Sequence, residues 1–159
     1  MSGSNLSSDT TRLLRHLVAT IAFRASRTLR NPPEGFEELR LAEGGMTAHE
    51  LLVHMSNVMS FALATVTGTE RVRHEPTEWP QEVDRFYSLL AQVDAKLAAG
   101  TSMEAGMDLR LVQGPLADTL THIGQLHAIR RKAGHPVPPT NYIKADIQAG
   151  RTALRDHGE

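Results

Sequence analysis

Histidine is the residue type with which this sequence could do chemistry, since the chain holds eight histidines and no cysteine. Asp118 and His122 are four residues apart in a stretch of helical periodicity, so both side chains project from one face, one turn apart. The same spacing places paired ligands on one ion in helix-borne zinc sites. His127 follows His122 by five residues, about 140° around a helix, which does not favour a shared metal ion.

His54 is the second candidate ligand. It lies at the edge of the apolar arc of another helical stretch, near Val58 and Phe61, and is expected to point into a helical bundle or along its rim. His49 lies opposite that arc and His16 lies opposite the apolar stripe of an earlier helix, so both are expected to be solvated. The remaining histidines of the sequence fall in connections or in the C-terminal tail: His74, His135 and His157.

Each of these residues also has an interpretation without a metal ion. An inward-facing histidine of a bundle is compatible with a hydrogen-bonded structural role, and Asp118 could serve only the positive end of its helix. The run Arg130-Arg131-Lys132 fits the last turn of a helix, where cations meet the negative end of the dipole. Met55 and Met59 are expected in the core.

Four amphipathic segments must position these residues. Apolar residues recur at spacings of three and four over residues 8–30, 47–68, 80–98 and 115–133. Thr47 and Glu50 have the spacing of a capping box at the start of the second segment. The polar connection 69–78 is long enough to cross over along the bundle. The pattern predicts an all-α fold, a four-helix bundle with a long crossover between the second and third helices, in a single domain over 1–159.

Two shorter helices are also expected. Thr101 and Glu104 have capping-box spacing and predict a helix to about Val112, which Gly114-Pro115 should break before the last long helix. A second short helix is predicted over residues 142–149 of the tail.

Composition excludes several classes of protein. The net charge is -1, from 17 Lys and Arg against 18 Asp and Glu, without the basic excess typical of a nucleic-acid partner. No stretch approaches the roughly 20 apolar residues of a membrane span. No basic segment followed by an apolar one opens the chain, so a cytoplasmic location is expected. The lack of cysteine excludes disulfides, thiolate nucleophiles and iron–sulfur clusters.

A family resemblance adds to these observations. The stretch GPLADTLTHIGQL at 114–126, followed by RRKAG at 130–134, resembles the last-helix signature of the DinB/YfiT-like superfamily. In that signature a ligand histidine commonly precedes a Gly-Gln pair. The segment ELLVHM at 50–55 is similar to the family's second helix, and NYIKADI at 141–147 is similar to the tail of some members. The last-helix segment is the most specific part of the resemblance.

The resemblance implies a bundle, often dimeric, that holds a divalent metal ion by three histidines near one end. His54 and His122 match the first and third ligand positions, whereas Asp118 stands where the family commonly has its second histidine. Aspartate is an accepted ligand for zinc, nickel, iron or manganese, so two histidines and one carboxylate fit a metal site. The departure is equally compatible with weaker binding or loss of the metal. Gln125 would then support a ligand or face the open coordination position.

The function that the resemblance implies is that of a metal-dependent enzyme acting on a small molecule, by thiol-dependent transfer or isomerisation or by hydrolysis. Because the chain has no cysteine, a thiol nucleophile would be a low-molecular-weight cosubstrate. A homodimer is expected. The alternative is a non-catalytic dimeric bundle, structural or stress-associated, with a degenerate metal site. Metal content of the purified protein distinguishes the two hypotheses.

Overall fold

The computed structural model describes residues 4–155, and helices dominate them. The all-α prediction is confirmed, since the described strands are only two residues long and pair with each other antiparallel. None of the described helices combines the length and apolar character that crossing a membrane requires. The elements are, in order, β1 (Ser4–Asn5), α1 (Ser8–Leu29), η1 (Phe36–Glu38), α2 (Ala48–Thr67), α3 (Trp79–Ala98), β2 (Ser102–Met103), α4 (Met107–Leu111), η2 (Val112–Leu116) and α5 (Ala117–Lys132).

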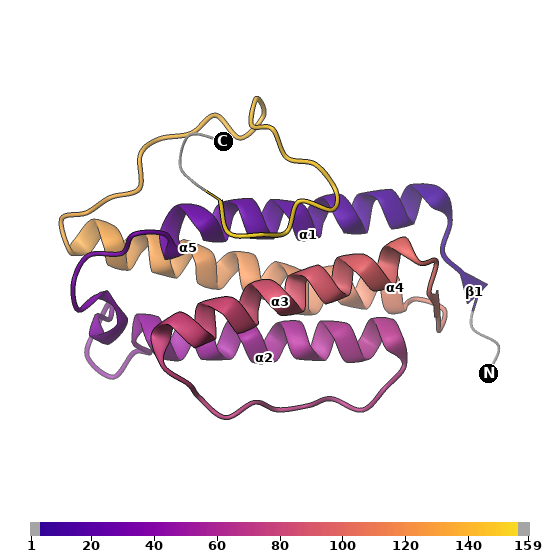
Figure 1. Ribbon diagram of the computed structural model, residues 1–159, viewed down its shortest axis with the longest axis horizontal. Coiled ribbons are helices and arrows are strands. Elements are labelled where there is room, and N and C mark those ends of the chain that lie inside the picture. Colours follow the sequence, from indigo (N-terminus) through magenta and orange to yellow (C-terminus); the bar gives the residue numbers. More distant parts are fainter. Residues whose placement is uncertain (1–3, 156–159) are drawn as a thin grey trace.

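The four long helices α1, α2, α3 and α5 surround one core (Figure 1). Helices α1 and α2 each pack against both α3 and α5. The connection 68–78 returns along α2, where Asn57 bonds the backbone of His74 and Ser60 donates to the carbonyl of Val72. As a result α3 starts beside the start of α2, and the two helices run in the same direction (Figure 1).

Local sequence explains where α2 begins and ends and what it buries. Thr47 and Glu50 form the predicted capping box, in which each side chain accepts from the other residue's backbone N–H. Gly68 ends the helix in the left-handed conformation at φ 65°. Both methionines predicted in the core are fully buried there. The largest fully buried side chains are Phe36, Phe86, Ile21, Leu52, Met55, Met59, Leu90, Leu97, Leu111, Leu116, Leu126 and Ile129.

The predicted break at Gly114-Pro115 is wrong. The chain stays helical from α4 through the π-helical segment η2 into α5, with Pro115 inside η2. Proline lacks an N–H donor and collides with the carbonyl four residues earlier in an α-helix. The wider π turn accommodates it, with the N–H of Ala117 bonded five residues back to Val112. The helix predicted to start near Thr101 instead begins at Met107, because residues 102–103 form β2.

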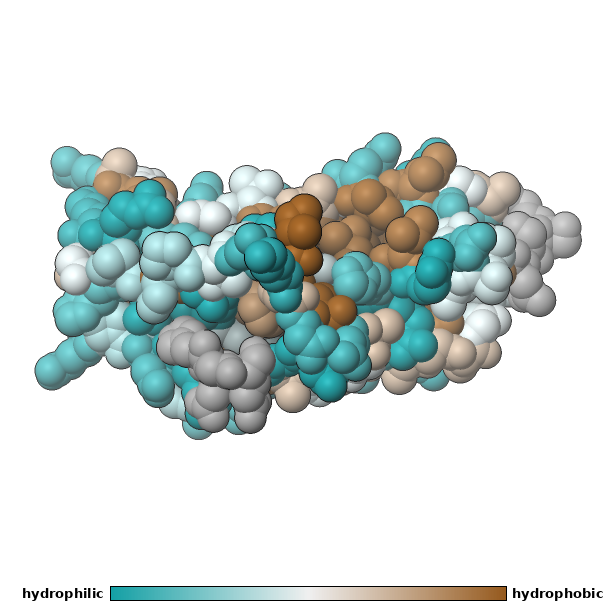
Figure 2. Space-filling model, turned by 90° about the horizontal axis from the view of Figure 1, so that it is seen from above, coloured by the Kyte–Doolittle hydropathy of each residue, from teal (hydrophilic) through white to brown (hydrophobic). Residues whose placement is uncertain are grey.

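The predicted tail helix over 142–149 is also wrong. The tail crosses α1 (Figure 1) without a helix in its described part, 134–155. Tyr142 packs under the guanidinium of Arg24 at 3.8 Å from its ring centroid and edge-on to Phe23. These contacts with α1, rather than a repeating helical ladder, fix its path. Figure 2 shows this side of the molecule as largely hydrophilic, with apolar side chains gathered near its middle and toward one end.

Arg130 joins the ends of two helices. Its side chain is 8% exposed and donates to the carbonyls of Thr28, Arg30, Asn31 and His135. The first three lie at the C-terminus of α1, where helical carbonyls lack intrahelical partners and the dipole favours a cation. Arg130 therefore stabilises the end of α1 as well as its own helix.

Substituting Arg130→Lys should lower the free energy of unfolding by about 1–3 kcal/mol, because one ammonium cannot reproduce the fork of the guanidinium across these carbonyls. Urea denaturation followed by circular dichroism measures the change. Arg131→Lys, at an exposed neighbouring position, is the control and should change stability by less than about 0.5 kcal/mol. Equal effects of the two substitutions would contradict the role of Arg130.

Candidate metal centre

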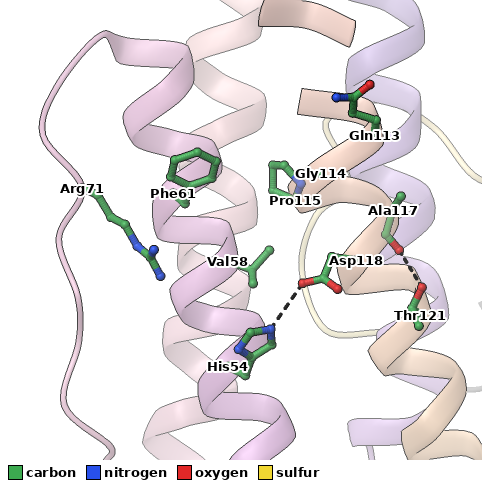
Figure 3. A pocket seen from close by; sticks show the side chains of 10 residues that line it. All are labelled: His54, Val58, Phe61, Arg71, Gln113, Gly114, Pro115, Ala117, Asp118 and Thr121. Carbon is green, nitrogen blue, oxygen red and sulfur yellow. Dashed lines mark hydrogen bonds and ion pairs between the residues drawn. The ribbon is translucent and has the colours of Figure 1, made fainter. Parts of the chain in front are cut away.

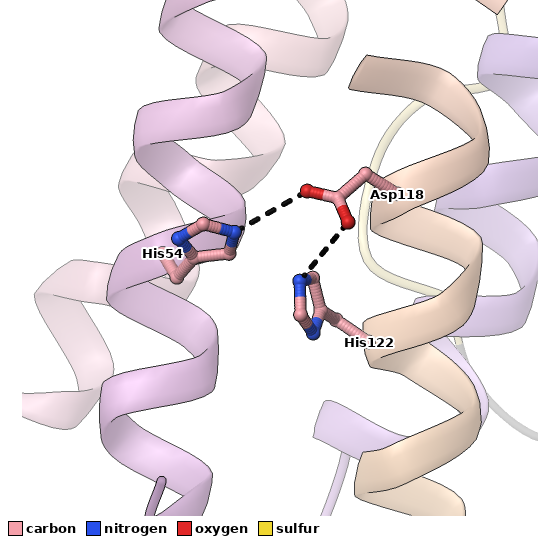
Figure 4. Close-up of side chains that lie close together, drawn as sticks. All are labelled: His54, Asp118 and His122. Carbon is pink, nitrogen blue, oxygen red and sulfur yellow. Dashed lines mark hydrogen bonds and ion pairs between the residues drawn. The ribbon is translucent and has the colours of Figure 1, made fainter. Parts of the chain in front are cut away.

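The three predicted ligands lie together between α2 and α5. His54 projects from α2 toward Asp118 of α5 (Figure 3), and His122 lies one turn beyond Asp118 (Figure 4). The two carboxylate oxygens of Asp118 face the two imidazoles separately. His54 Nε2 lies 3.3 Å from Oδ2, and His122 Nε2 lies 3.3 Å from Oδ1. The i, i+4 pair on α5 and the single histidine on α2 thus form one group.

The spacing of this group suits a metal ion. The three ligand atoms lie within 4.8 Å of one another. Tetrahedral zinc with ligands at 2.0–2.1 Å separates its ligand atoms by roughly 3.3 Å, which is the distance from each imidazole nitrogen to its own oxygen of Asp118. A single Asp118 oxygen would have to come within this distance of both rings. The imidazole rings stand nearly perpendicular, at 81°, with centroids 4.6 Å apart. Two nitrogen donors and one carboxylate could therefore hold an ion after a small closure between the rings.

Gln125 determines how His122 presents itself. Its Oε1 lies 2.7 Å from His122 Nδ1, so the imidazole donates there. A neutral imidazole that donates from Nδ1 keeps a lone pair on Nε2, which here faces Asp118 Oδ1. A proton or a metal ion between these two acceptors would satisfy both. A metal-ligating histidine usually donates its other ring N–H to an oxygen acceptor, as His122 does here to Gln125.

The three side chains of the group differ in their exposure to solvent. The His122 side chain is only 11% exposed, whereas those of His54 and Asp118 are 44% and 45% exposed. The π turn η2 directly precedes α5 and shifts its register, so it sets the direction of Asp118. The group therefore has a buried floor and an open side, as a site that admits a small molecule requires.

The open side borders a cavity of about 530 Å³, within the range of small-molecule sites. Sequence reasoning missed most of its lining. Phe61 follows His54 by two helical turns, a periodicity that could have placed it here. No sequence pattern marked Arg71 as a lining residue, because it reaches the cavity only through the return of the connection along α2. The lining residues are His54, Val58, Phe61, Arg71, Gln113, Gly114, Pro115, Ala117, Asp118 and Thr121 (Figure 3).

The other described histidines lie outside the group. His16 is exposed, as expected. His49 is not simply solvated, because it donates to the carbonyl of Thr77 at 2.7 Å and its ring lies beside Trp79. His74 and His135 lie in connections, and the expectation for His157 falls outside the described residues.

His127 lies on α5 in a cationic, half-buried setting. Burial has the largest effect on its pKa and lowers it below the usual value. A backbone hydrogen bond at Arg24 acts in the opposite direction and raises the pKa. The positive charges of Arg27, Arg24 and Arg130 lower the pKa further. Its Nε2 is buried without a hydrogen-bond partner among the described residues. His127 is therefore held neutral and does not belong to the candidate centre.

This environment predicts a pH dependence of stability. Because the pKa of His127 is lower in the folded chain than in the unfolded one, the unfolded chain binds more protons below about pH 6.5. The free energy of unfolding should therefore fall as the pH drops through 6.5, and His127→Gln should reduce that fall. Denaturation of the metal-free protein between pH 7.5 and 5 measures it. His16→Gln, at an exposed position, should leave the profile unchanged, and identical profiles for His127→Gln and the unsubstituted protein would contradict the assignment.

Comparison with known proteins gives no match, whether with protein-family models, curated proteins or solved structures. The resemblance to the DinB/YfiT-like superfamily accordingly stays a prediction. The candidate centre rests on its own geometry, in which two helices bring His54, Asp118 and His122 to a common point beside an open cavity.

Proposed function

We propose that the protein is a metal-dependent enzyme that holds a divalent ion at His54, Asp118 and His122 and acts on a small molecule in the adjoining cavity. One observation carries the proposal. His122 donates to Gln125 through Nδ1 and turns Nε2 toward a carboxylate that it shares with His54. To Gln125, expected from the sequence either to support a ligand or to face the open coordination position, the proposal assigns the supporting role.

The donor set defines which ions fit. Two imidazole nitrogens and one carboxylate oxygen suit zinc, nickel, iron or manganese. Three protein ligands leave at least one coordination position, the arrangement of catalytic rather than structural zinc sites. The ligand side chains that border the cavity, His54 and Asp118, put that position within reach of a small molecule.

Four residues of the chain have further roles in this proposal. Asp118 neutralises one positive charge and Gln125 fixes the tautomer and orientation of His122. Val58 and Phe61 present apolar surface that excludes water from one side of the cavity. A divalent ion held here supplies Lewis acidity, which lowers the pKa of a water or thiol that it coordinates. The reaction classes proposed are thiol-dependent transfer or isomerisation, with a low-molecular-weight thiol as cosubstrate, and hydrolysis.

The proposal includes the resemblance to the DinB/YfiT-like superfamily, which is a prediction from sequence. The two matched histidines lie on facing helices, and the connection after α2 returns along that helix. The first feature is the one the resemblance implies for the ligands, and the second was expected from the length of the connection. A homodimer belongs to the same proposal.

A second candidate function follows from a different property of the same group. The Asp118 carboxylate is placed to accept hydrogen bonds from both imidazoles, so a proton can satisfy the cluster without any ion. On that hypothesis the protein is a non-catalytic helical bundle with a degenerate site. It predicts a purified protein without metal, whose melting temperature does not respond to added Zn²⁺, Ni²⁺ or Mn²⁺.

The ligand assignment is tested by calorimetric titration of the metal-stripped protein with Zn²⁺. The unsubstituted chain should bind one ion, and His54→Ala, Asp118→Asn or His122→Ala should each weaken binding by more than about 100-fold, because a ligand has been removed. His49→Ala and His16→Ala are the controls and should bind as the unsubstituted chain does. Unchanged binding in His122→Ala would refute the assignment.

The supporting role of Gln125 gives a separate prediction. Gln125→Leu should weaken Zn²⁺ binding by about 10–100-fold, since His122 loses the acceptor that orients it. Gln125→Glu keeps an acceptor oxygen at the same distance along the side chain and should retain most of the affinity. The same titration measures both variants. Equal losses in the two would show that packing, rather than the hydrogen bond, accounts for the effect.

A further inference from the structure

We propose that the cavity beside the centre selects a small molecule with an apolar body and a carboxylate, which binds Arg71 while the other end of the molecule reaches the metal position. The inference rests on the proposed function and names the substrate class of the same site. It depends on three features of the cavity: its walls, its single cation and its length.

The walls are mostly apolar. Val58 and Phe61 from α2 lie opposite Pro115 of η2 (Figure 3), and Ala117 of α5 also contributes to the lining. Thr121 adds little polarity, because its hydroxyl already donates to the carbonyl of Ala117 at 3.1 Å. A pocket with these walls favours an aliphatic or aromatic body, and its few polar groups determine orientation.

Arg71 is the one cationic side chain in the lining. It extends from the returning connection toward α2 (Figure 3), where its guanidinium lies 5.7 Å from the ring centroid of Phe61. Within the described residues 4–155 it has no carboxylate partner. An arginine positioned by an aromatic ring, with its fork of donors unpaired, is suited to bind a carboxylate in bidentate fashion. A single guanidinium without a second cation fits this monoanion better than a phosphate dianion.

The helical register limits the span that a ligand must bridge. Phe61 follows His54 by seven residues on α2, which at 1.5 Å per residue separates the two by about 10 Å. The metal position lies at the His54 end, and the Arg71 guanidinium, 5.7 Å from the Phe61 ring centroid, lies between the levels of Phe61 and His54 (Figure 3). A molecule that spans both therefore needs its carboxylate and its metal-binding group at opposite ends of a short chain or ring.

Charge favours the same class of ligand. Asp118 and Arg71 are the formally charged residues of the lining, and they cancel in the absence of metal. A divalent ion at the centre makes the cavity positive at both ends. Walls of low polarity strengthen that field and raise the local concentration of anions.

The test uses the protein loaded with Co²⁺, whose visible spectrum reports coordination of a thiolate. The probes are 6-mercaptohexanoate and its neutral counterpart 6-mercaptohexan-1-ol, which share the same sulfur and chain. The carboxylate probe should bind about tenfold more tightly to the unsubstituted protein, the effect expected of one charge-assisted hydrogen-bonded pair. Arg71→Gln should abolish that preference while leaving Co²⁺ content and the affinity for the neutral probe unchanged.

Arg73→Gln is the matched control, because Arg73 is exposed on the same connection and does not line the cavity. It should keep the preference for the carboxylate probe. Equal affinities of the two probes for the unsubstituted protein would overturn this inference alone, as would a preference that survives in Arg71→Gln. Failure of the protein to take up Co²⁺ would overturn both this inference and the metal centre on which it rests.

Discussion

The structure depends on the packing of α2 against α5, because that contact brings His54 within 3.3 Å of a carboxylate 64 residues away in the chain. Neither helix holds a site alone, since α5 supplies two donors and α2 supplies the third. Buried apolar side chains, among them Met55 of α2 and Leu126 of α5, keep the two helices at this separation. The polar group therefore lies at the margin of the core and depends on it for its geometry.

The π turn before α5 affects both the cavity and the candidate metal ligands. An uninterrupted α-helix through Pro115 would leave a clash at the proline ring, and the wider turn removes it. The extra residue in that turn rotates α4 and the start of η2 relative to α5. Pro115 consequently lines the cavity beside Ala117, the first residue of α5, while Asp118 faces the imidazoles. A single local irregularity thus shapes both the wall of the cavity and the direction of a candidate ligand.

The grouping of His54 with Asp118 and His122, across 64 residues of chain, was implied by the family resemblance. Periodicity and caps predicted the long helices and the shared face of Asp118 and His122 well, because both depend on local sequence. The capping box at Thr47 and the i, i+4 spacing of Asp118 and His122 are of this kind. The predictions that were wrong concern segments whose structure depends on contacts with residues far away in the sequence. The tail follows α1 through contacts such as Tyr142 with Arg24, and Thr101 is followed by a strand because residues 102–103 pair with residues 4–5. Arg71 reaches the cavity only through the path of a connection that has no periodicity.

The way the connection after α2 is anchored separates two properties of the site. Asn57 and Ser60 hold it through backbone atoms of His74 and Val72, so its path does not require particular side chains at those positions. Arg71 lies on this segment, whereas the three candidate ligands lie on helices that share the core. Substitutions along the connection can therefore change what the cavity accepts without disturbing the packing that holds the ligands. The fold keeps the candidate metal ligands and the cationic side chain of the cavity on separately evolvable parts of one chain.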